Sequence, residues 1–223
     1  AYVFGGSIDI PGSSYREFLI AGIFAQTIVF GSTFTGAGLA DDMQKGIIDR
    51  FRSLPMARSA VLIGRTASDI FTNSVSIIVM SVTGLIVGWR IRTSVPEAIV
   101  GFALLLIFAY AVSWIMAWVG LKVKSVEVVN NASFMFIFPM TFIANTFVPS
   151  ENLPLVLRTF AEWNPVSAVT QAVREAFGNT TGLAPASTWS LRNPEIYTLL
   201  WVAIILAVFV PLAVRQYRIA AVR

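Results

Sequence analysis

The chain has 223 residues, of which 56% are hydrophobic and only 13% are charged. A soluble domain carries about 25% charged residues, so this composition excludes an ordinary water-soluble globule and indicates that lipid is part of the solvent. The sequence contains no Cys and no His, which excludes a disulfide framework and a thiolate metal site and removes the commonest general base. The net charge of +4 matters less than where the positive side chains lie along the chain.

Residues 1–16 are rich in Gly, Ser and Pro, which is typical of a loop. Residues 18–40 carry no charge and are long enough to cross a hydrocarbon core of about 30 Å. Within this first span, Ser32 and Gly36 form a pair of small residues one turn apart, which allows two helices to approach closely. We expect ordinary packing within the bundle there, with a subunit interface as the alternative.

The stretch 41–65 is the long polar interruption between two apolar runs, and it holds five of the sixteen Lys and Arg residues. We predict a short helix that begins at Asp41 and Asp42, whose carboxylates suit a helix N-terminus, and that stops before Pro55. Gly46 is unfavourable within such a helix and suggests close packing against a neighbour. The apolar stripe is Met43, Ile47, Phe51 and Leu54, and the other face carries Lys45, Asp49, Arg50 and Arg52. This pattern fits either a helix resting on anionic lipid or a docking helix for a soluble subunit.

Four further apolar runs predict spans over residues 66–89, 97–120, 127–148 and 196–214. We expect Arg65 and Asp69, four residues apart at the start of the second span, to form a local ion pair. The fourth span carries a series of aromatic residues that includes Phe134, Phe138 and Phe142. These side chains either line a path for an apolar substrate or face lipid and neighbouring helices.

The segment 149–195 is too polar and too interrupted to span a membrane. Two short amphipathic helices, over 153–163 and 166–177, are separated by Asn164 and Pro165. Their length predicts an external re-entrant or interfacial hairpin over 150–178. On the second helix we expect Arg174 on the polar face.

Five spans place the loops alternately on two sides. One set (41–65, 121–126 and 215–223) holds ten of the sixteen Lys and Arg residues, although the other set (1–16, 90–96 and 149–195) is longer. The positive-inside rule therefore predicts that the first set and the C-terminus are cytoplasmic. With residue 1 outside, we also expect a further span upstream, which makes six spans in total.

Four segments resemble the permease subunit of type-two ABC exporters, in the branch related to daunorubicin-resistance and lipid-export permeases. They are YREFLIAGI (15–23), KGIIDRFRSLPMARSAVLIGR (45–65), FVPSENLP (147–154) and WNPVSAVTQAVREAFGN (163–179). The resemblance covers essentially the whole chain, 1–223, as a single transmembrane domain. It implies an all-α polytopic bundle in the bacterial plasma membrane, surrounded by lipid, with no role for nucleic acid.

The resemblance also implies two permease subunits and two ATP-binding cassette subunits per transporter. On this sequence it places a coupling helix over 41–55, with Arg50, Arg52 and Pro55 carrying the family pattern and contacting the ATPase. Since the sequence has no GxxxxGK[ST] motif, ATP and Mg are expected on the partner ATPase and not on this chain. No catalytic or metal-binding residue is expected here.

We therefore expect a non-enzymatic transport subunit that moves a hydrophobic or amphiphilic drug or lipid outward. A polysaccharide or glycolipid exporter of the same family is the alternative. A membrane-embedded transferase would need a His or carboxylate site, and a passive channel would need charged rings or a filter loop. The sequence offers neither pattern.

Overall fold

The computed structural model describes residues 15–47, 58–123, 125–180 and 188–220, and every regular element in those ranges is a helix. Its elements are α1 (Tyr15–Gly31), α2 (Thr33–Gln44), α4 (Arg58–Val87), α5 (Val95–Val123), α6 (Val126–Phe142), the 3-10 turn η1 (Ser150–Asn152), α7 (Leu155–Glu162), α8 (Pro165–Ala176), α9 (Trp189–Arg192) and α10 (Pro194–Ala220). Within the described ranges, four stretches are long and apolar enough to cross a membrane: Tyr15–Gln44, Leu62–Val87, Val95–Val123 and Pro194–Ile219. The predicted all-α polytopic membrane bundle is confirmed.

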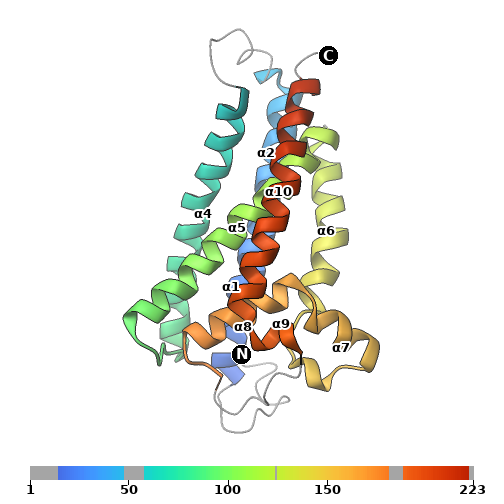
Figure 1. The fold of residues 1–223 in the computed structure, drawn as a ribbon. Coiled ribbons are helices and arrows are strands. Elements are labelled where there is room, and N and C mark those ends of the chain that lie inside the picture. The colour runs from blue at the N-terminus through green and yellow to red at the C-terminus, as the bar shows by residue number, and fades with distance from the viewer. Residues whose placement is uncertain (1–14, 48–57, 124, 181–187, 221–223) are drawn as a thin grey trace.

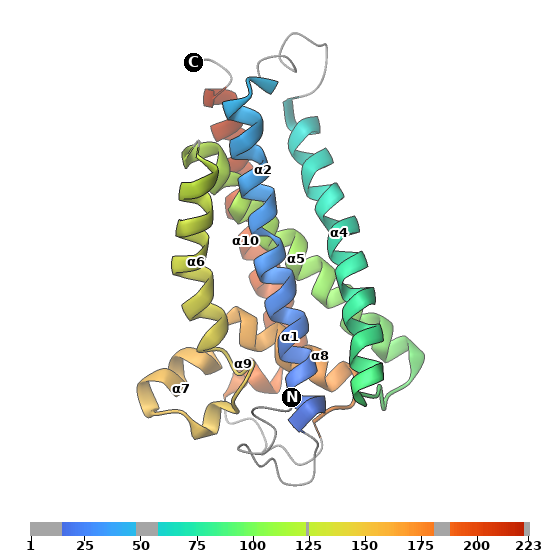
Figure 2. The same ribbon diagram turned by 180° about the vertical axis from the view of Figure 1, so that it is seen from behind.

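The long helices run between the same two ends of the molecule and alternate in direction (Figure 1). The basic end consists of residues 41–47, 58–62, 120–123 and 213–220, and the hairpin end consists of residues 15–18, 88–96, 143–180 and 188–196. Figure 2 shows the same arrangement from behind. The described parts of the loops therefore fall into the two sets that the sequence predicts.

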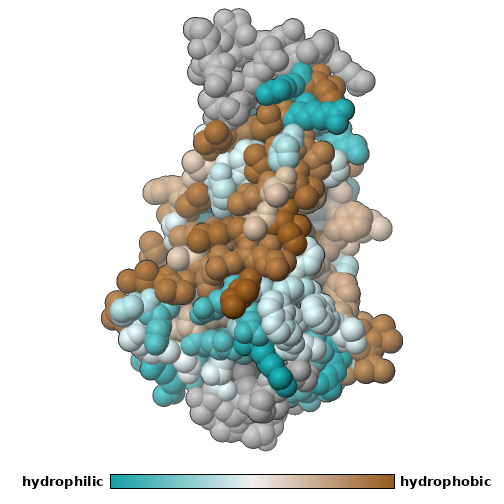
Figure 3. All heavy atoms as spheres, in the orientation of Figure 1, coloured by the Kyte–Doolittle hydropathy of each residue, from teal (hydrophilic) through white to brown (hydrophobic). Residues whose placement is uncertain are grey.

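α5 forms the centre of the bundle, where it packs against α2, α4, α8 and α10. Its buried side chains include Leu105, Phe108 and Trp114. By contrast, α4 exposes Phe71 and Ile86, which are 72% and 80% accessible. On the face shown in Figure 3, hydrophobic residues cover the middle of the molecule and hydrophilic residues gather toward its two ends. This distribution suits a bundle whose middle faces lipid or other membrane helices.

Ser32 separates α1 from α2 within a single crossing. Its hydroxyl donates to the Val29 carbonyl at 2.6 Å, a bond that competes with the helical ladder. One turn further on, a Cβ on Gly36 would lie 2.7 Å from the Met116 carbonyl oxygen of α5, and a Cβ on Gly120 would lie 2.8 Å from the Gly36 Cα. The small residues thus let α2 and α5 touch backbone to backbone, which is the packing role that we expected.

The hairpin breaks where the sequence predicts. Asn164 Oδ1 accepts a hydrogen bond from the Val166 amide at 2.9 Å, and Pro165 occupies the first helical position of α8, where its missing N–H costs nothing. The Asn164 side chain also donates to the Met140 carbonyl at 2.7 Å, which ties the hairpin to α6. α7 lies on the outside, with Leu155 78% exposed, whereas α8 is buried.

α6 is shorter than predicted, since it ends at Phe142 and not near position 148. Beyond it, the Asn145 amide donates to Ser167 Oγ at 3.0 Å, and the Asn145 carbonyl accepts from Arg174 Nη2 at 2.7 Å. The bond from the Asn145 amide to Ser167 replaces the intrahelical bond that this amide would have made in a longer α6. The hydrophobic run in the sequence does not indicate that contacts with α8 end the helix early.

Candidate functional site

A cleft of about 770 Å³ lies on the face of α1 and α2, between α4 and α6. Figure 2 shows α1 and α2 in the middle with those two helices on either side. Its polar lining comes mainly from α4 (Arg65, Ser68, Asp69, Thr72, Asn73 and Ser76), with Gln26 and Thr27 from α1 and Asn130 and Ser133 from α6. Polar groups that gather between apolar spans are costly unless they face water or a ligand, so this cleft is a candidate binding site.

Arg65 and Asp69 both line the cleft, but they do not form the local ion pair that the sequence predicts. The described residues form three ion pairs, Lys45–Asp41, Arg92–Glu17 and Arg158–Glu162. The Asp69 carboxylate instead accepts a hydrogen bond from the Thr35 hydroxyl. Arg65 Nη2 donates to the Phe34 carbonyl at 3.3 Å. Contacts with α2 therefore separate two charges that their spacing on α4 would allow to pair.

Gly38 explains how Arg65 reaches α2. A Cβ at this position would overlap the Arg65 guanidinium, so the side chain crosses from α4 to α2 only because Gly38 has none. The guanidinium then lies against the backbone of α2 and within reach of the Phe34 carbonyl. The absence of a side chain at one position of α2 thus determines where a charge on α4 lies.

Several hydroxyl groups of the cleft donate their protons to carbonyls of their own helices. Thr72 Oγ1 donates to the Ser68 carbonyl at 3.2 Å, and Ser76 Oγ donates to the Thr72 carbonyl at 3.0 Å. Ser133 Oγ of α6 donates in the same way to the Val129 carbonyl at 2.5 Å. Since each proton is engaged, the free lone pairs of these oxygens are what the cleft offers. These three side chains therefore offer hydrogen-bond acceptors to a ligand.

The three phenylalanines predicted for a substrate path form one stack along α6. Phe134 and Phe138 lie 5.5 Å apart and Phe138 and Phe142 lie 5.4 Å apart between ring centroids, with nearly parallel planes. Phe30 of α1 meets Phe134 edge-on at 5.8 Å. Only Phe134 lines the cleft, and the other two continue from it toward the hairpin end. Their role in transport stays a prediction.

At the basic end, the predicted start of the coupling helix is wrong. Asp41 and Asp42 lie in the last turn of α2 and not in the first turn of a new helix. Lys45 caps this end and its ammonium pairs with Asp41 at 2.7 Å, which raises the pKa of Lys45. The helical run simply continues through the two carboxylates, because Lys45 offsets their unfavourable position at a helix C-terminus.

Gly46 was expected to reflect close packing, and this expectation is also wrong. Among the described residues, a Cβ at Gly46 would meet nothing within 4 Å, and its φ of +66° is the left-handed conformation that ends helices. Ile47 follows in helical conformation. The remaining coupling residues, Asp49, Arg50, Phe51, Arg52, Leu54 and Pro55, lie outside the described residues.

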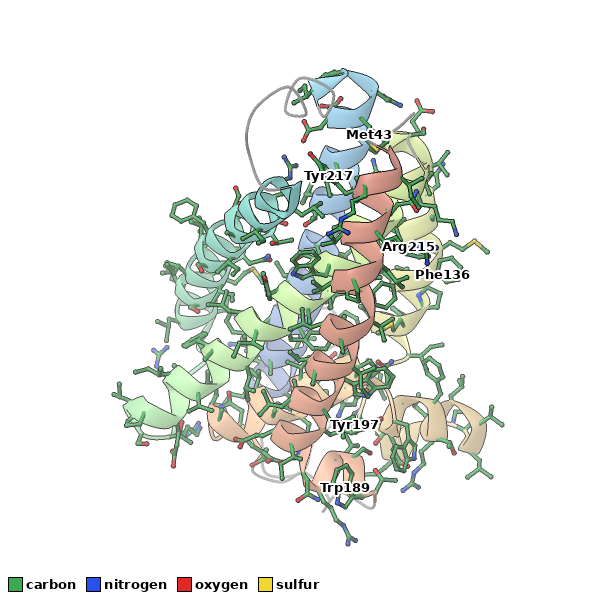
Figure 4. The ribbon with its side chains drawn as sticks, turned by 45° about the horizontal axis from the view of Figure 1, so that its top comes forward. Met43, Phe136, Trp189, Tyr197, Arg215 and Tyr217 are labelled. Atoms are coloured by element: carbon green, nitrogen blue, oxygen red, sulfur yellow. The ribbon has the colours of Figure 1, made fainter. Side chains whose placement is uncertain are left out.

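Met43 is partly buried at the basic end and packs against the bundle. It lies against a buried cluster that includes Leu39, Trp114, Leu121 and Tyr217. Figure 4 shows Met43 and Tyr217 close to this end and Tyr197 at the other end. The end of α2 is therefore a packed part of the bundle.

Arg174 lies in surroundings that differ from the predicted polar face. It is completely buried, its guanidinium lies 3.6 Å from the centre of the Phe18 ring, and its Nη2 donates to the Asn145 and Thr146 carbonyls at 2.7 and 3.2 Å. Burial lowers the pKa of Arg174 to about 9. Three buried polar atoms at this place, Arg174 Nη1, Asn145 Oδ1 and Thr146 Oγ1, have no hydrogen-bond partner among the described residues.

The sequence of α8 does contain a signal for this buried polar cluster. Ser167, Thr170 and Arg174 recur at helical spacing and are all completely buried. They form a polar stripe that faces α1 and the end of α6 rather than water. A polar stripe on a short helix is thus compatible with a solvated face or with a buried polar contact, and only its tertiary neighbours distinguish them.

These features define a class of protein: a polytopic α-helical membrane protein with a polar cleft between apolar spans, which is the architecture of a permease. The sequence model of the ABC-2 type transporter family matches residues 1–177, and the chain belongs to this family. It is a transmembrane permease homologous to the permeases of drug-resistance exporters.

Two relatives illustrate the similarity. The daunorubicin resistance ABC transporter permease protein DrrB1 of Streptomyces coeruleorubidus is 31% identical over 217 residues, which is 97% of this chain and 74% of the relative. The doxorubicin resistance ABC transporter permease protein DrrB of Mycobacterium tuberculosis is 25% identical over 204 residues, which is 91% of this chain and 70% of the relative. The match extends over both the cleft and the hairpin.

Proposed function

We propose that this chain is the permease subunit of an ATP-driven exporter that moves an amphiphilic or hydrophobic molecule across the bacterial plasma membrane. A separate ATP-binding cassette subunit binds ATP and Mg, and a second permease subunit completes the membrane part. The names of the relatives, which are permeases of drug-resistance ABC transporters, support this proposal. The C-terminus and the basic end lie on the cytoplasmic side, as the positive-inside rule favours.

The observation that carries the proposal is the polar cleft beside an aromatic stack. The cleft is lined by charged, amide and hydroxyl side chains, and Phe134 connects it to the exposed rings of Phe138 and Phe142. One side of this route suits a polar group and the other suits an apolar body. An amphiphile needs both, whereas a purely apolar molecule would gain nothing from the polar wall.

The ATPase docks, in this proposal, on the segment that follows Gly46. The packed end of α2 holds the start of this segment at the basic end, and Gly46 turns the chain there. Arg50, Arg52 and the apolar residues around them then supply a cationic amphipathic contact. Movement of the ATPase dimer is transmitted through this contact to α2 and α4.

Charge reversal of Arg50 and Arg52 tests this coupling. We expect the double variant R50E/R52E to insert normally but to lose ATP-dependent export by at least about tenfold, since lost contacts worth about 1.4 kcal/mol already have that effect. Ile47→Pro, which removes a helical N–H, should act in the same direction. Export of a fluorescent amphiphile from vesicles that also contain the ATPase is the measurement. Arg90→Glu, at the hairpin end, is the control and should export normally; unimpaired export by R50E/R52E contradicts the docking assignment.

A further inference from the structure

The two charges in the cleft point to the chemistry of its ligand. We infer that the cleft binds a zwitterionic head group, with the anionic part of the ligand beside Arg65 and its ammonium beside Asp69. This inference rests on the proposed function and deepens it, because it names the class of amphiphile that the permease accepts. A phosphoethanolamine head group, in which a short carbon link joins the two charges, has this chemistry.

The arrangement of the two charges favours a ligand that carries both signs. Arg65 and Asp69 are one turn apart on the same helix, so their side chains open into the cleft about 6 Å apart along the axis. Each has a neutral hydrogen-bond partner on α2, the Phe34 carbonyl and the Thr35 hydroxyl, and neither pairs with the other. Opposite charges that remain apart in a partly buried site gain most from a ligand that supplies an oppositely charged partner to each of them.

The neutral hydroxyl groups that line the cleft favour an ammonium in the ligand. The hydroxyl protons of Thr72, Ser76 and Ser133 are engaged by carbonyls of their own helices. Their oxygens are acceptors, which suit the three N–H donors of a primary ammonium. The cleft therefore has several groups for a cation and one strong donor, Arg65, for an anion. A ligand with a single negative charge would leave Asp69 without a cationic partner and these acceptors without a donor from the ligand.

The aromatic stack on α6 offers a surface for the apolar tail of the ligand. Arg65 and Asp69 lie in the part of the span Leu62–Val87 that is nearest the basic end. From Phe134, the rings of Phe138 and Phe142 lead away from this level toward the hairpin end, and they are 41% and 58% exposed. An acyl tail would follow this direction in the leaflet on the basic side. The polar cleft thus receives the head group and the aromatic rings of α6 receive the acyl tail, in the same order along the bundle as in the lipid.

The experiment compares head groups on a constant tail. The full chain in maltoside micelles is titrated with lysophosphatidylethanolamine, with lysophosphatidylglycerol and with an alkylammonium of the same chain length, and the shift of the unfolding midpoint gives each apparent Kd. We expect the zwitterion to bind about tenfold more tightly than either singly charged probe. Asp69→Asn should abolish its advantage over the anion, and Arg65→Gln should abolish its advantage over the cation.

Glu97→Gln, which removes a charge at the hairpin end, is the matched control and should keep the wild-type preference. The wild-type chain alone can overturn the inference, so the test stands even if a variant fails to fold. It is overturned if the three probes bind equally well, or if none of them binds because another segment fills the cleft. A parallel export assay with the ATPase separates the two proposals. Export that ignores the head group in the wild type and both variants defeats only the inference, whereas ATP-independent movement of every probe defeats the proposed function and the inference with it.

Discussion

Replacement of Arg174 by alanine is expected to lower the free energy of unfolding by about 3–5 kcal/mol. The guanidinium is completely buried and hydrogen-bonds the Phe18, Asn145 and Thr146 carbonyls, which join α8 to α1 and to the end of α6. The alanine variant would leave acceptors without donors and a cavity beside the Phe18 ring. Chemical unfolding of the full chain in detergent micelles measures the loss.

A variant of similar volume separates the two causes. Arg174→Met fills most of the space but donates no hydrogen bond, so it should be less destabilising than Arg174→Ala, by the cost of the cavity. The methionine also avoids the burial of a charge, which works against the wild-type residue. An alanine variant within about 1 kcal/mol of wild type would mean that Arg174 does not fasten the hairpin to the bundle.

Gly120→Ala is expected to destabilise the chain by about 2–3 kcal/mol, although alanine is normally the better helix former. A Cβ at this position would lie 2.8 Å from both the Cα and the carbonyl carbon of Gly36, so α2 and α5 would have to move apart. Both contacts are with backbone, which cannot turn aside as a flexible side chain can. The same unfolding experiment measures the effect.

Gly64→Ala provides the control, since a Cβ on this helical glycine of α4 would meet no atom of the described part of the chain within 4 Å. Only helix propensity changes there, and we expect a gain of up to about 1 kcal/mol. The two substitutions are chemically identical, so opposite signs identify close backbone packing as the cause. If Gly120→Ala is as stable as Gly64→Ala, α2 and α5 do not touch in this way.

Sequence patterns succeeded where one local property determines the structure. Long apolar runs predicted five spans, and four of them are long and apolar enough to cross a membrane in the described residues, whereas α6 is too short to be counted with them. The break between α7 and α8 followed from Asn164 and Pro165, since capping and a missing N–H act at the residue itself. Alternation of the loops then followed from the number of spans.

The errors arose where a tertiary contact competes with a local preference. The carboxylates of Asp41 and Asp42 suit a helix start, yet α2 continues through them to Gln44, with Lys45 paired to Asp41. α6 ends early because α8 binds the amide and carbonyl of Asn145. Local spacing carries no information about either partner.

The candidate site was the part of the structure that the sequence predicted least well. The phenylalanines on α6 were visible as a series, but the cleft depends on α1, α2, α4 and α6 together. Spacing on α4 favoured an Arg65–Asp69 pair, and only the approach of Thr35 and the Phe34 carbonyl separates the two charges. A site assembled from several helices emerges from their packing and not from a motif.

The orientation of the bundle tests the account most directly, because docking of the ATPase requires the basic end to face the cytoplasm. The sequence has no native Cys, so single cysteines can be introduced cleanly at the exposed positions Glu151, at the hairpin end, and Lys122, at the basic end. Asn164 is unsuitable because its buried side chain caps α8. In intact cells a membrane-impermeant maleimide should label Glu151→Cys, and it should label Lys122→Cys only after permeabilisation. The reverse pattern would place the basic end outside and contradict the account.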